Sequence, residues 1–564
     1  MATSETSPAS AALPGVTGAP GIAIGRVVWL VPSAGAAEAA GTLPWRQRLE
    51  QAQAEVARHL DGLAAELAAE SKPEEAAIFE AQAMLASDPA LLAAVEQHLD
   101  RPLQEAVVAA TEALAEQFAA LDNAYLRERA ADVRAVGQQI AAVLVGGSLD
   151  AEPDVAPGAV VLADELSPAQ LAVLRRRGIA GLATARGGAT GHLALLARTF
   201  GLPSLVGVGD RLRSVLEGSL VIVAASDGQL IVGPSPEDVS AYQRRAEALA
   251  RDADARQALR GLPAVTADGH RLALWANIGR PEEARAAVDV GADGIGLMRT
   301  EFLFLDRASA PGEDEQYAAY VAVLHALADR PAIVRTLDIG GDKPLPYVPR
   351  LDEANPFLGT RGIRYAMHAP DLLRVQLRAL LRAAAEAHAG GGLHVMLPMV
   401  ATPADVVWAR GRLQAAAEEL AVEGLAHRAD VPLGIMVETP AAALTLDRLA
   451  AAGQLSFCSI GSNDLAQYTL AADRGEAGLA QRYRHDDPAV FRLIRQAVVS
   501  AGRLGLAISL CGELAADPAA SVALVGLGLD KLSMAPPALL AVKAALRGVS
   551  LDEARERAAR ACAD

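Results

Sequence analysis

Apolar residues recur at helical spacing between residues 44 and 145 of the chain. Positions three, four or seven residues apart fall on one face of a helix, so the spacing predicts a bundle of amphipathic helices. The recurring positions include Val56, Leu60, Leu63 and Leu67, then Val107, Leu114, Phe118 and Leu121.

Short apolar runs lie on both sides of this predicted bundle. Residues 21–28 read GIAIGRVV, and the runs GAVVLAD, GIAGLAT and SLVIVAA alternate with helical stretches after the break at Gly146-Gly147. Short apolar runs bounded by glycine or proline are typical of buried strands, and their alternation with helices indicates an α/β unit. We therefore expect the bundle to be an insertion into a small α/β domain that starts near the N-terminus.

A buried-strand pattern then recurs eight times beyond a charged helical stretch at 236–260. The charged stretch has little sustained apolar face, which suits a connector with a hinge between rigid bodies. Eight strands alternating with amphipathic helices predict a closed (β/α)8 barrel. The eight runs are LALWANIG, GIGLMRTE, AIVRTLDIGGDK, HVMLPMV, GIMVETP, FCSIGSNDL, AISLCGE and KLSMAP.

These patterns predict an α/β multidomain fold. It comprises a small swivelling α/β domain with an inserted α-helical bundle, followed by a C-terminal (β/α)8 barrel. The expected divisions are a disordered tail at 1–15, the α/β domain at 16–40 and 148–235, the helical domain at 41–147, a helical linker at 236–262 and the barrel at 263–564.

Composition adds an expected location. The first fifteen residues lack the basic and apolar regions of a signal peptide, and no uncharged apolar stretch reaches the roughly 18 residues of a membrane span. Three scattered cysteines are too few for a disulfide framework or a CxxC metal site, which fits a reducing cytosol. We therefore expect a soluble, cytoplasmic protein. Its formal charge of −17 argues against non-specific nucleic-acid binding and is compatible with a basic protein partner or with solubility alone.

Polar residues follow the predicted barrel strands. Because the carboxyl ends of barrel strands line one mouth, residues more than 200 positions apart are expected to converge there. The expected set is Arg299, Arg335, Asp338, Lys343, Glu438, Asn463, Asp464 and Cys511.

The cations near these strand ends indicate a ligand carrying both phosphate and carboxylate, because arginine forks bind either group. Any one of them alone would fit an ordinary pair with a nearby carboxylate equally well. The cations are Arg299, Arg335, Lys343, Arg361 and Arg474.

Two carboxylates and one thiol at strand ends suggest further chemistry. Glu438 and Asp464 are hard oxygen ligands suited to Mg²⁺, although the same pair would also serve to bridge barrel loops through arginine or lysine. If the ligand carries a phosphate, the metal interpretation is favoured over the bridging one, because the ion can bridge phosphate and carboxylate oxygens. Cys511 is placed to donate a proton to a substrate carbon, but a lone cysteine at a strand end is more often inert.

A second candidate site lies in GGATGHLALLAR, where a glycine-rich turn delivers His192 to the start of an apolar helix. A neutral imidazole is nucleophilic near pH 7, and glycines, a helix N-terminus and the Thr190 hydroxyl are suited to receive phosphate. A lone histidine is more often a cap or surface residue. The glycine setting favours a nucleophile here.

Ten ordered motifs, covering nearly the whole chain, make it resemble enzyme I of the bacterial phosphoenolpyruvate-dependent sugar phosphotransferase system. They are EEAAIFEAQAML, AYLRERAADVR, GGATGHLALLAR, ANIG, GIGLMRTEFLF, VRTLDIGGDK, NPFLGTRGIR, IMVETPAAA, GSNDLAQYTLAADRG and CGELA.

The resemblance implies that phosphoenolpyruvate phosphorylates His192, that Cys511 protonates the enolate, and that the histidine of the carrier protein HPr is the acceptor. It further implies a homodimer through the barrel domain. Phosphoenolpyruvate contacts would be Arg299, Arg335, Lys343, Arg361, Asn463, Asp464 and Arg474, the Mg²⁺ ligands Glu438 and Asp464, and the carrier contacts Phe79, Met84 and Leu85.

The chain departs from the family pattern at Gly191, where serine is common, and at Ser462 and Ala466, where threonines are common. Two other interpretations remain open. A phosphoenolpyruvate synthase or pyruvate-phosphate dikinase would need an ATP-binding domain, yet the helical region of about 100 residues before the histidine domain carries no glycine loop of the kind that cradles ATP phosphates. A sensor of phosphoenolpyruvate without turnover would not need His192, Cys511 and the two carboxylates together.

Overall fold

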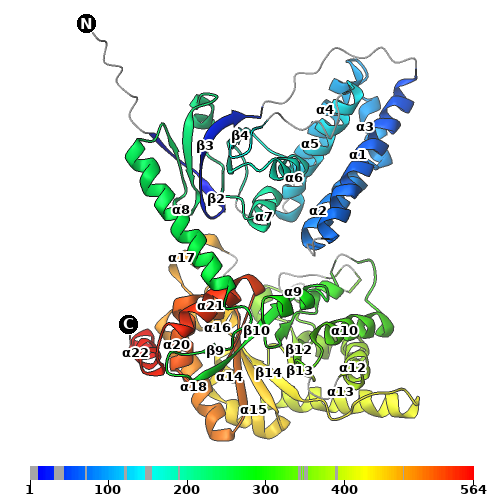
Figure 1. Ribbon diagram of the computed structural model, residues 1–564. Helices are drawn as coiled ribbons and strands as arrows, with labels where there is room; N and C mark the ends of the chain where they lie inside the picture. Colours follow the sequence, from blue (N-terminus) through cyan, green and yellow to red (C-terminus); the bar gives the residue numbers. More distant parts are fainter. Residues whose placement is uncertain are drawn as a thin grey trace. The chain divides into compact units, whose positions relative to one another are not determined.

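The computed structural model describes two compact units, Met1–Ala253 and Asp254–Asp564. Helix α8 (Pro236–Gln257) crosses the boundary between them as one continuous helix without buried residues, as expected of a connector (Figure 1). The described residues are 11–30, 43–69, 73–119, 124–146, 155–188, 191–305, 307–340, 345, 347–348, 353–387, 392–473 and 476–563.

The first unit contains an eight-stranded sheet in the order β1-β8-β7-β3-β4-β5-β6-β2. Strand β3 pairs in parallel with β4 and antiparallel with β7, so the sheet is mixed. Helices α6 (Pro168–Arg176) and α7 (His192–Thr199) follow β4 and β5. The strands are β1 (Ala11–Pro14), β2 (Val16–Ala19), β3 (Ile22–Trp29), β4 (Val160–Ala163), β5 (Gly181–Thr184), β6 (Ser204–Val206), β7 (Leu220–Ala224) and β8 (Gln229–Val232).

One boundary expected from the sequence is wrong. Residues 1–15 were expected to be a disordered tail, but Ala11–Pro14 forms β1 and pairs antiparallel with β8. The backbone of β1 pairs with β8, which makes β1 the edge strand of the sheet, and Leu13 is buried in the core. The tail expectation for residues 1–10 concerns positions outside the described residues.

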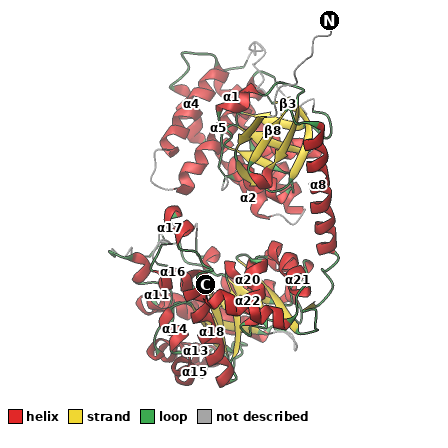
Figure 2. Cartoon of the chain, turned by 90° about the vertical axis from the view of Figure 1, so that its left-hand side faces the viewer, coloured by secondary structure: helices red, strands yellow, loops and turns green. Residues whose placement is uncertain are grey.

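The described residues between β3 and β4 form five helices, which confirms the inserted bundle. Figure 2 shows these helices in red beside the yellow sheet of the same unit. Leu49, Val56, Leu60 and Ile140 are fully buried among them. The helices are α1 (Trp45–Ala69), α2 (Pro73–Ala86), α3 (Pro89–Glu96), α4 (Leu103–Ala119) and α5 (Ala124–Leu144).

Within the described residues, no single helix has both the length and the apolar character of a membrane span. Only the successive segments Ala76–Ala86 and Pro89–Glu96 reach that combination when taken together, and a bend of 49° separates them.

The second unit contains the predicted barrel. All eight predicted strands are present, and β10 pairs in parallel with both β11 and β17, which closes the cylinder. The barrel strands are β10 (Arg271–Ile278), β11 (Ile295–Met298), β12 (Ala332–Arg335), β13 (Leu393–Leu397), β14 (Leu433–Val437), β15 (Phe457–Gly461), β16 (Ala507–Cys511) and β17 (Lys531–Met534), with β9 (Ala264–Val265) paired antiparallel to β10.

Helices surround the barrel and pack their apolar faces on its strands. Helices α18 and α20 begin with an aspartate followed by proline, and Asp487 and Asp517 accept hydrogen bonds from the first turn. The helices are α9 (Glu283–Asp289), α10 (Glu313–Leu327), α11 (Ile363–His368), α12 (Pro370–Ala385), α13 (Pro403–Val422), α14 (Pro440–Leu444), α15 (Leu446–Gly453), α16 (Ser462–Leu470), α17 (Ala477–Arg482), α18 (Pro488–Leu504), α19 (Glu513–Ala516), α20 (Pro518–Gly526), α21 (Leu539–Arg547) and α22 (Leu551–Ala563).

Candidate active site

His192 is the first residue of α7, in the first unit. Gly191 precedes it in an extended conformation and supplies no side-chain cap, and Gly187 adopts a φ of 112° that favours glycine. The His192 side chain is 21% exposed. The imidazole is therefore held at a helix start while retaining access to solvent. Thr190 lies outside the described residues.

An acidic partner fixes this imidazole from one side. The Nδ1 atom of His192 lies 3.2 Å from Oδ2 of Asp132, which belongs to α5 of the inserted bundle. Asp132 is nearly fully buried, and its Oδ1 accepts a hydrogen bond of 2.8 Å from the amide of Gln82. A carboxylate accepting from Nδ1–H leaves the Nε2 lone pair available for attack. Sequence reasoning missed Asp132, although the motif AYLRERAADVR that contains it was singled out.

Arg335 ends β12 and is buried at the barrel mouth. Its Nη2 donates to Oε1 of Glu301 at 2.7 Å, and its Nη1 lies 3.1 Å from Oδ2 of Asp338. The same Glu301 oxygen accepts from the backbone N–H of Asp338 at 3.0 Å. Burial acts to lower the Arg335 pKa, but the surrounding carboxylates outweigh it and raise the pKa overall, so the guanidinium stays charged. Sequence reasoning gave Glu301 no role, although it lies inside the motif GIGLMRTEFLF.

Arg361 joins two carboxylates of the mouth. Its Nε and Nη2 donate to Asp338 at 3.1 and 3.0 Å, and its Nη1 and Nη2 donate to Asp464 at 3.0 and 3.1 Å. Burial opposes the Arg361 charge, yet Asp338 and Asp464 more than offset it and raise the pKa. The sequence left open that Asp464 pairs with an arginine instead of binding a metal. The structure shows such a pair, between Asp464 and Arg361.

Glu438 follows β14 and is fully buried. Its Oε1 accepts from the backbone N–H of Met399 at 2.5 Å, whereas Oε2 has no hydrogen-bond partner among the described residues. Burial, then repulsion from Asp464 and Asp338, raise the pKa of Glu438 to about 8. An unpartnered buried oxygen in a crowded acidic site is costly, and a divalent cation would relieve that cost.

The donor set fits Mg²⁺ in kind, since Glu438 and Asp464 offer oxygens from two neighbouring strand ends. The described residues hold no group of three His, Cys, Asp or Glu side chains arranged for a metal. Two carboxylates leave coordination positions for water and phosphate oxygens, which is typical of Mg²⁺ bound together with a phosphorylated substrate.

Cys511 ends β16 and is 2% exposed. Burial raises the pKa of its thiol, and the Ser459 hydroxyl and the charges of Arg335 and Arg299 act in the opposite direction. Arg299 follows β11, is exposed, and forms no ion pair with a described residue, so its guanidinium is free to meet an anion.

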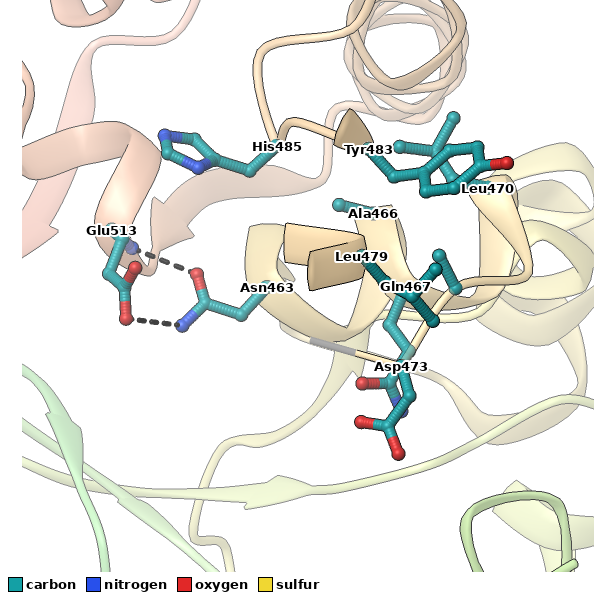
Figure 3. A pocket seen from close by; sticks show the side chains of 10 residues that line it. Asn463, Ala466, Gln467, Leu470, Asp473, Leu479, Tyr483, His485 and Glu513 are labelled. Carbon is teal, nitrogen blue, oxygen red and sulfur yellow. Dashed lines mark hydrogen bonds between the residues drawn. The ribbon is translucent and has the colours of Figure 1, made fainter. Parts of the chain in front are cut away.

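Asn463 pairs with Glu513 instead of with another predicted site residue. The backbone N–H of Glu513 donates to Oδ1 of Asn463 at 3.0 Å, and Nδ2 of Asn463 donates back at 3.4 Å. Figure 3 shows this pair facing a pocket of about 180 Å³ whose other side carries Leu470 and Tyr483. The pair joins the starts of α16 and α19. Lys343 and Arg474 lie outside the described residues.

The expected carrier contacts require a correction. Phe79 is fully buried in the core of the first unit, because the apolar face of α2 packs against its neighbouring helices, so it cannot contact a partner. Leu85 is partly buried against the same core. Met84 is 70% exposed and is the one of the three available at the surface.

Three family models match the chain in sequence order. The N-terminal domain of PEP-utilising enzymes matches residues 14–129, their mobile domain residues 155–228, and their PEP-binding domain residues 253–551. The PEP-binding match alone covers more than half of the chain and coincides with the barrel.

Curated relatives match over most of their length. The phosphoenolpyruvate-protein phosphotransferase of Haloferax volcanii is 42% identical over 557 residues, 97% of this chain and 96% of that protein. The protein of the same description from Geobacillus stearothermophilus is 40% identical over 90% of this chain and 87% of its own length. That from Staphylococcus carnosus is 38% identical over 86% and 85%. The chain therefore belongs to the phosphoenolpyruvate-protein phosphotransferase family of enzymes.

Proposed function

We propose that this chain transfers the phosphoryl group of phosphoenolpyruvate to its own His192 and then to the histidine of the carrier protein HPr, releasing pyruvate, as the first step of a sugar-uptake phosphorelay. One observation carries the proposal. A buried cluster of guanidinium and carboxylate groups lies at the mouth of a barrel in the same chain as a histidine whose Nδ1 faces an aspartate.

The barrel mouth has the chemistry to bind phosphoenolpyruvate. Arg299, Arg335 and Arg361 offer fixed positive charge, and we assign Lys343, Asn463, Asp464 and Arg474 to the same site from the family resemblance. Arg361 is held by Asp338 and Asp464, so its planar fork is oriented before substrate arrives. Mg²⁺ bound to Glu438 and Asp464 would neutralise part of the phosphate charge.

The chain's own groups then perform the transfer. Asp132 holds the Nδ1–H of His192, and the Nε2 lone pair forms the N–P bond as the bridging P–O bond breaks. The electrons of the broken bond remain on the oxygen of pyruvate enolate. Cys511 donates its thiol proton to C3 of that enolate, which converts it to pyruvate and draws the reaction forward.

His192 and the barrel mouth belong to different compact units, so the mechanism requires movement. The α/β unit would approach the barrel for phosphorylation and turn to the carrier for transfer, with α8 as the connector. Met84, near the acidic segment Glu66–Glu80, remains the candidate carrier contact. We also propose that the protein forms a homodimer through the barrel domain and that it is cytoplasmic.

The test is mass spectrometry of the full chain after exposure to labelled phosphoenolpyruvate and Mg²⁺. We expect an acid-labile phosphoryl group on wild-type protein and on His325→Ala, an exposed-histidine control, and none on His192→Ala. Adding HPr should discharge the label and phosphorylate HPr. Label surviving on His192→Ala would move the nucleophile elsewhere, and unlabelled wild type would favour a sensor.

A further inference from the structure

Ser459 lies inside the barrel directly beside Cys511. It is on β15, the strand next to β16, and the two strands are parallel with Gly461 opposite Cys511. Alternate residues of β15 face opposite ways, so Cys458 and Ile460 join the core between strands and helices, while Phe457 joins the interior cluster that contains Cys511. Ser459 therefore shares the interior side with Phe457.

The serine hydroxyl donates a hydrogen bond to the sulfur. The Oγ of Ser459 is 3.3 Å from the Sγ of Cys511, and the two residues are 0% and 2% exposed. This is the one hydrogen bond that the Ser459 side chain makes with a described residue. A hydroxyl buried at this depth is therefore committed to the thiol.

The strand register leaves few other partners for the sulfur. Gly461, the residue opposite Cys511, has no side chain, and a Cβ there would come within 3.0 Å of Glu438 and Met436. A side chain at this position, from which β15 would otherwise reach the thiol, would press on Glu438 and Met436. The hydrogen bond to the sulfur comes instead from Ser459, which lies two residues before Gly461 on β15.

We propose that Ser459 is a positioning residue for proton transfer by Cys511, holding the thiol in place and stabilising the thiolate that the transfer leaves behind. The inference rests on the proposed role of Cys511. In the step, the C2–C3 π electrons of pyruvate enolate form a C–H bond with the thiol proton, the S–H electron pair stays on sulfur, and the enolate oxygen becomes the ketone oxygen. Ser459 keeps its own proton throughout.

The surroundings of Cys511 disfavour its thiolate, so a hydrogen-bond donor to the sulfur has a large effect. Burial disfavours a thiolate, and the nearby carboxylate of Glu438 disfavours it further, whereas Arg335 and Arg299 favour it. A hydrogen bond to an ionised acceptor is roughly twice as strong as one between neutral groups, so the Ser459 bond strengthens at the moment the sulfur becomes charged. The hydroxyl therefore favours the transition state over the resting thiol.

The experiment separates the proton step from the phosphoryl step. Phosphorylated full-length enzyme is incubated with pyruvate and Mg²⁺ in D2O, and proton NMR follows deuterium entering the pyruvate methyl group. Formation of phosphohistidine from labelled phosphoenolpyruvate is measured separately by rapid quench. We expect Ser459→Ala to slow deuterium exchange by about tenfold while the KM for phosphoenolpyruvate stays within about twofold of wild type.

Two variants provide controls. Ser509→Ala removes a buried hydroxyl from β16, two residues before Cys511, that makes no hydrogen bond to the sulfur among the described residues, and it should exchange at the wild-type rate. Ser459→Thr keeps the hydroxyl and should restore most of the exchange lost in Ser459→Ala. Thermal unfolding of each variant confirms that it is folded.

The outcomes distinguish the two levels of the proposal. Wild-type exchange in Ser459→Ala, together with loss of exchange in Cys511→Ala, would overturn the role of Ser459 and leave Cys511 as the donor. Exchange persisting in Cys511→Ala would overturn the proposed donor itself. Equal slowing in Ser459→Ala and Ser509→Ala would reduce the hydroxyl to a packing role and also overturn the inference.

Discussion

The side-chain oxygen of Gln376 accepts a hydrogen bond of 2.9 Å from the backbone N–H of Leu337, in the loop that carries the barrel-mouth carboxylate Asp338. The amide of the same fully buried glutamine donates to Thr300 and Tyr320, each at 3.2 Å. Helix α12 thereby supports the loop from behind. The position of Asp338, and with it the orientation of Arg361, depends on this contact.

Replacing Gln376 with methionine, which has a similar shape but no amide, should destabilise the protein and weaken substrate binding. The Leu337 N–H would remain buried without a partner, so we expect a loss of about 1–3 kcal/mol in the free energy of unfolding. Denaturant titration and the KM for phosphoenolpyruvate measure the two effects. Gln496→Met, on the exposed face of α18, is the control and should change neither. An unaltered unfolding midpoint in Gln376→Met would contradict the network.

The contact between Asp132 and His192 leads to a second prediction. Asp132→Asn keeps the shape but removes the negative charge that selects the Nδ1–H tautomer and stabilises the charged phosphohistidine. We expect phosphorylation of His192 to slow by about 100-fold or more, as measured by rapid quench. Nitrogen-15 NMR of the imidazole should show a loss of the Nδ1–H tautomer. Glu112→Gln, which disrupts the half-exposed pair with Arg134, should leave both measurements unchanged.

Much of the fold could be predicted because its strands are locally distinctive. The eight barrel strands are continuous apolar runs that end in polar residues, which is how strands covered on both faces read in a sequence. Strand β1 was missed for the opposite reason. Its four residues, Ala11–Pro14, have no distinctive pattern, and their partners on β8 lie more than 200 residues away. Such pairing depends on tertiary structure alone.

The same distinction applies to the site. Arg335, Glu438 and Cys511 were predictable because strand ends in a barrel point to one mouth, a rule that needs no three-dimensional detail. Asp132, by contrast, is a buried polar residue on a bundle helix, and only the three-dimensional structure shows its contact with His192. The prediction for Phe79 failed because an apolar residue in a bundle helix is far more often core than surface.

Metal binding should depend on the orphaned oxygen of Glu438. Glu438→Gln preserves the acceptor for the Met399 N–H but cannot ionise when the cation binds, so we expect affinity for Mn²⁺, used as a paramagnetic substitute for Mg²⁺, to fall at least about tenfold. Electron paramagnetic resonance of free Mn²⁺ measures binding without turnover. Glu386→Gln, an exposed carboxylate bonded to Tyr317, controls for loss of general negative charge. Unchanged Mn²⁺ affinity would exclude Glu438 as a ligand.

The stability of the protein should depend on pH through His394, which is partly buried on β13 with its ring 5.4 Å from that of Phe457. Burial, followed by the positive charges of Lys531 and Arg428, lowers its pKa below the usual 6.5. The unfolded chain therefore binds a proton more readily than the folded protein once the pH falls below about 6.5. This histidine's contribution to stability is complete above that pH and declines as the pH decreases toward the folded-state pKa.

His394→Gln removes the titrating group, so its thermal midpoint should fall less than that of the wild type between about pH 6.5 and pH 5. The comparison needs only the difference between the two proteins, because the other titrating groups contribute equally to both. His427→Gln, at a half-exposed position outside the barrel strands, should follow the wild-type curve. If His394→Gln lost as much stability on acidification as the wild type, the ring would not be held neutral by its surroundings, and the acid sensitivity would have to come from another group.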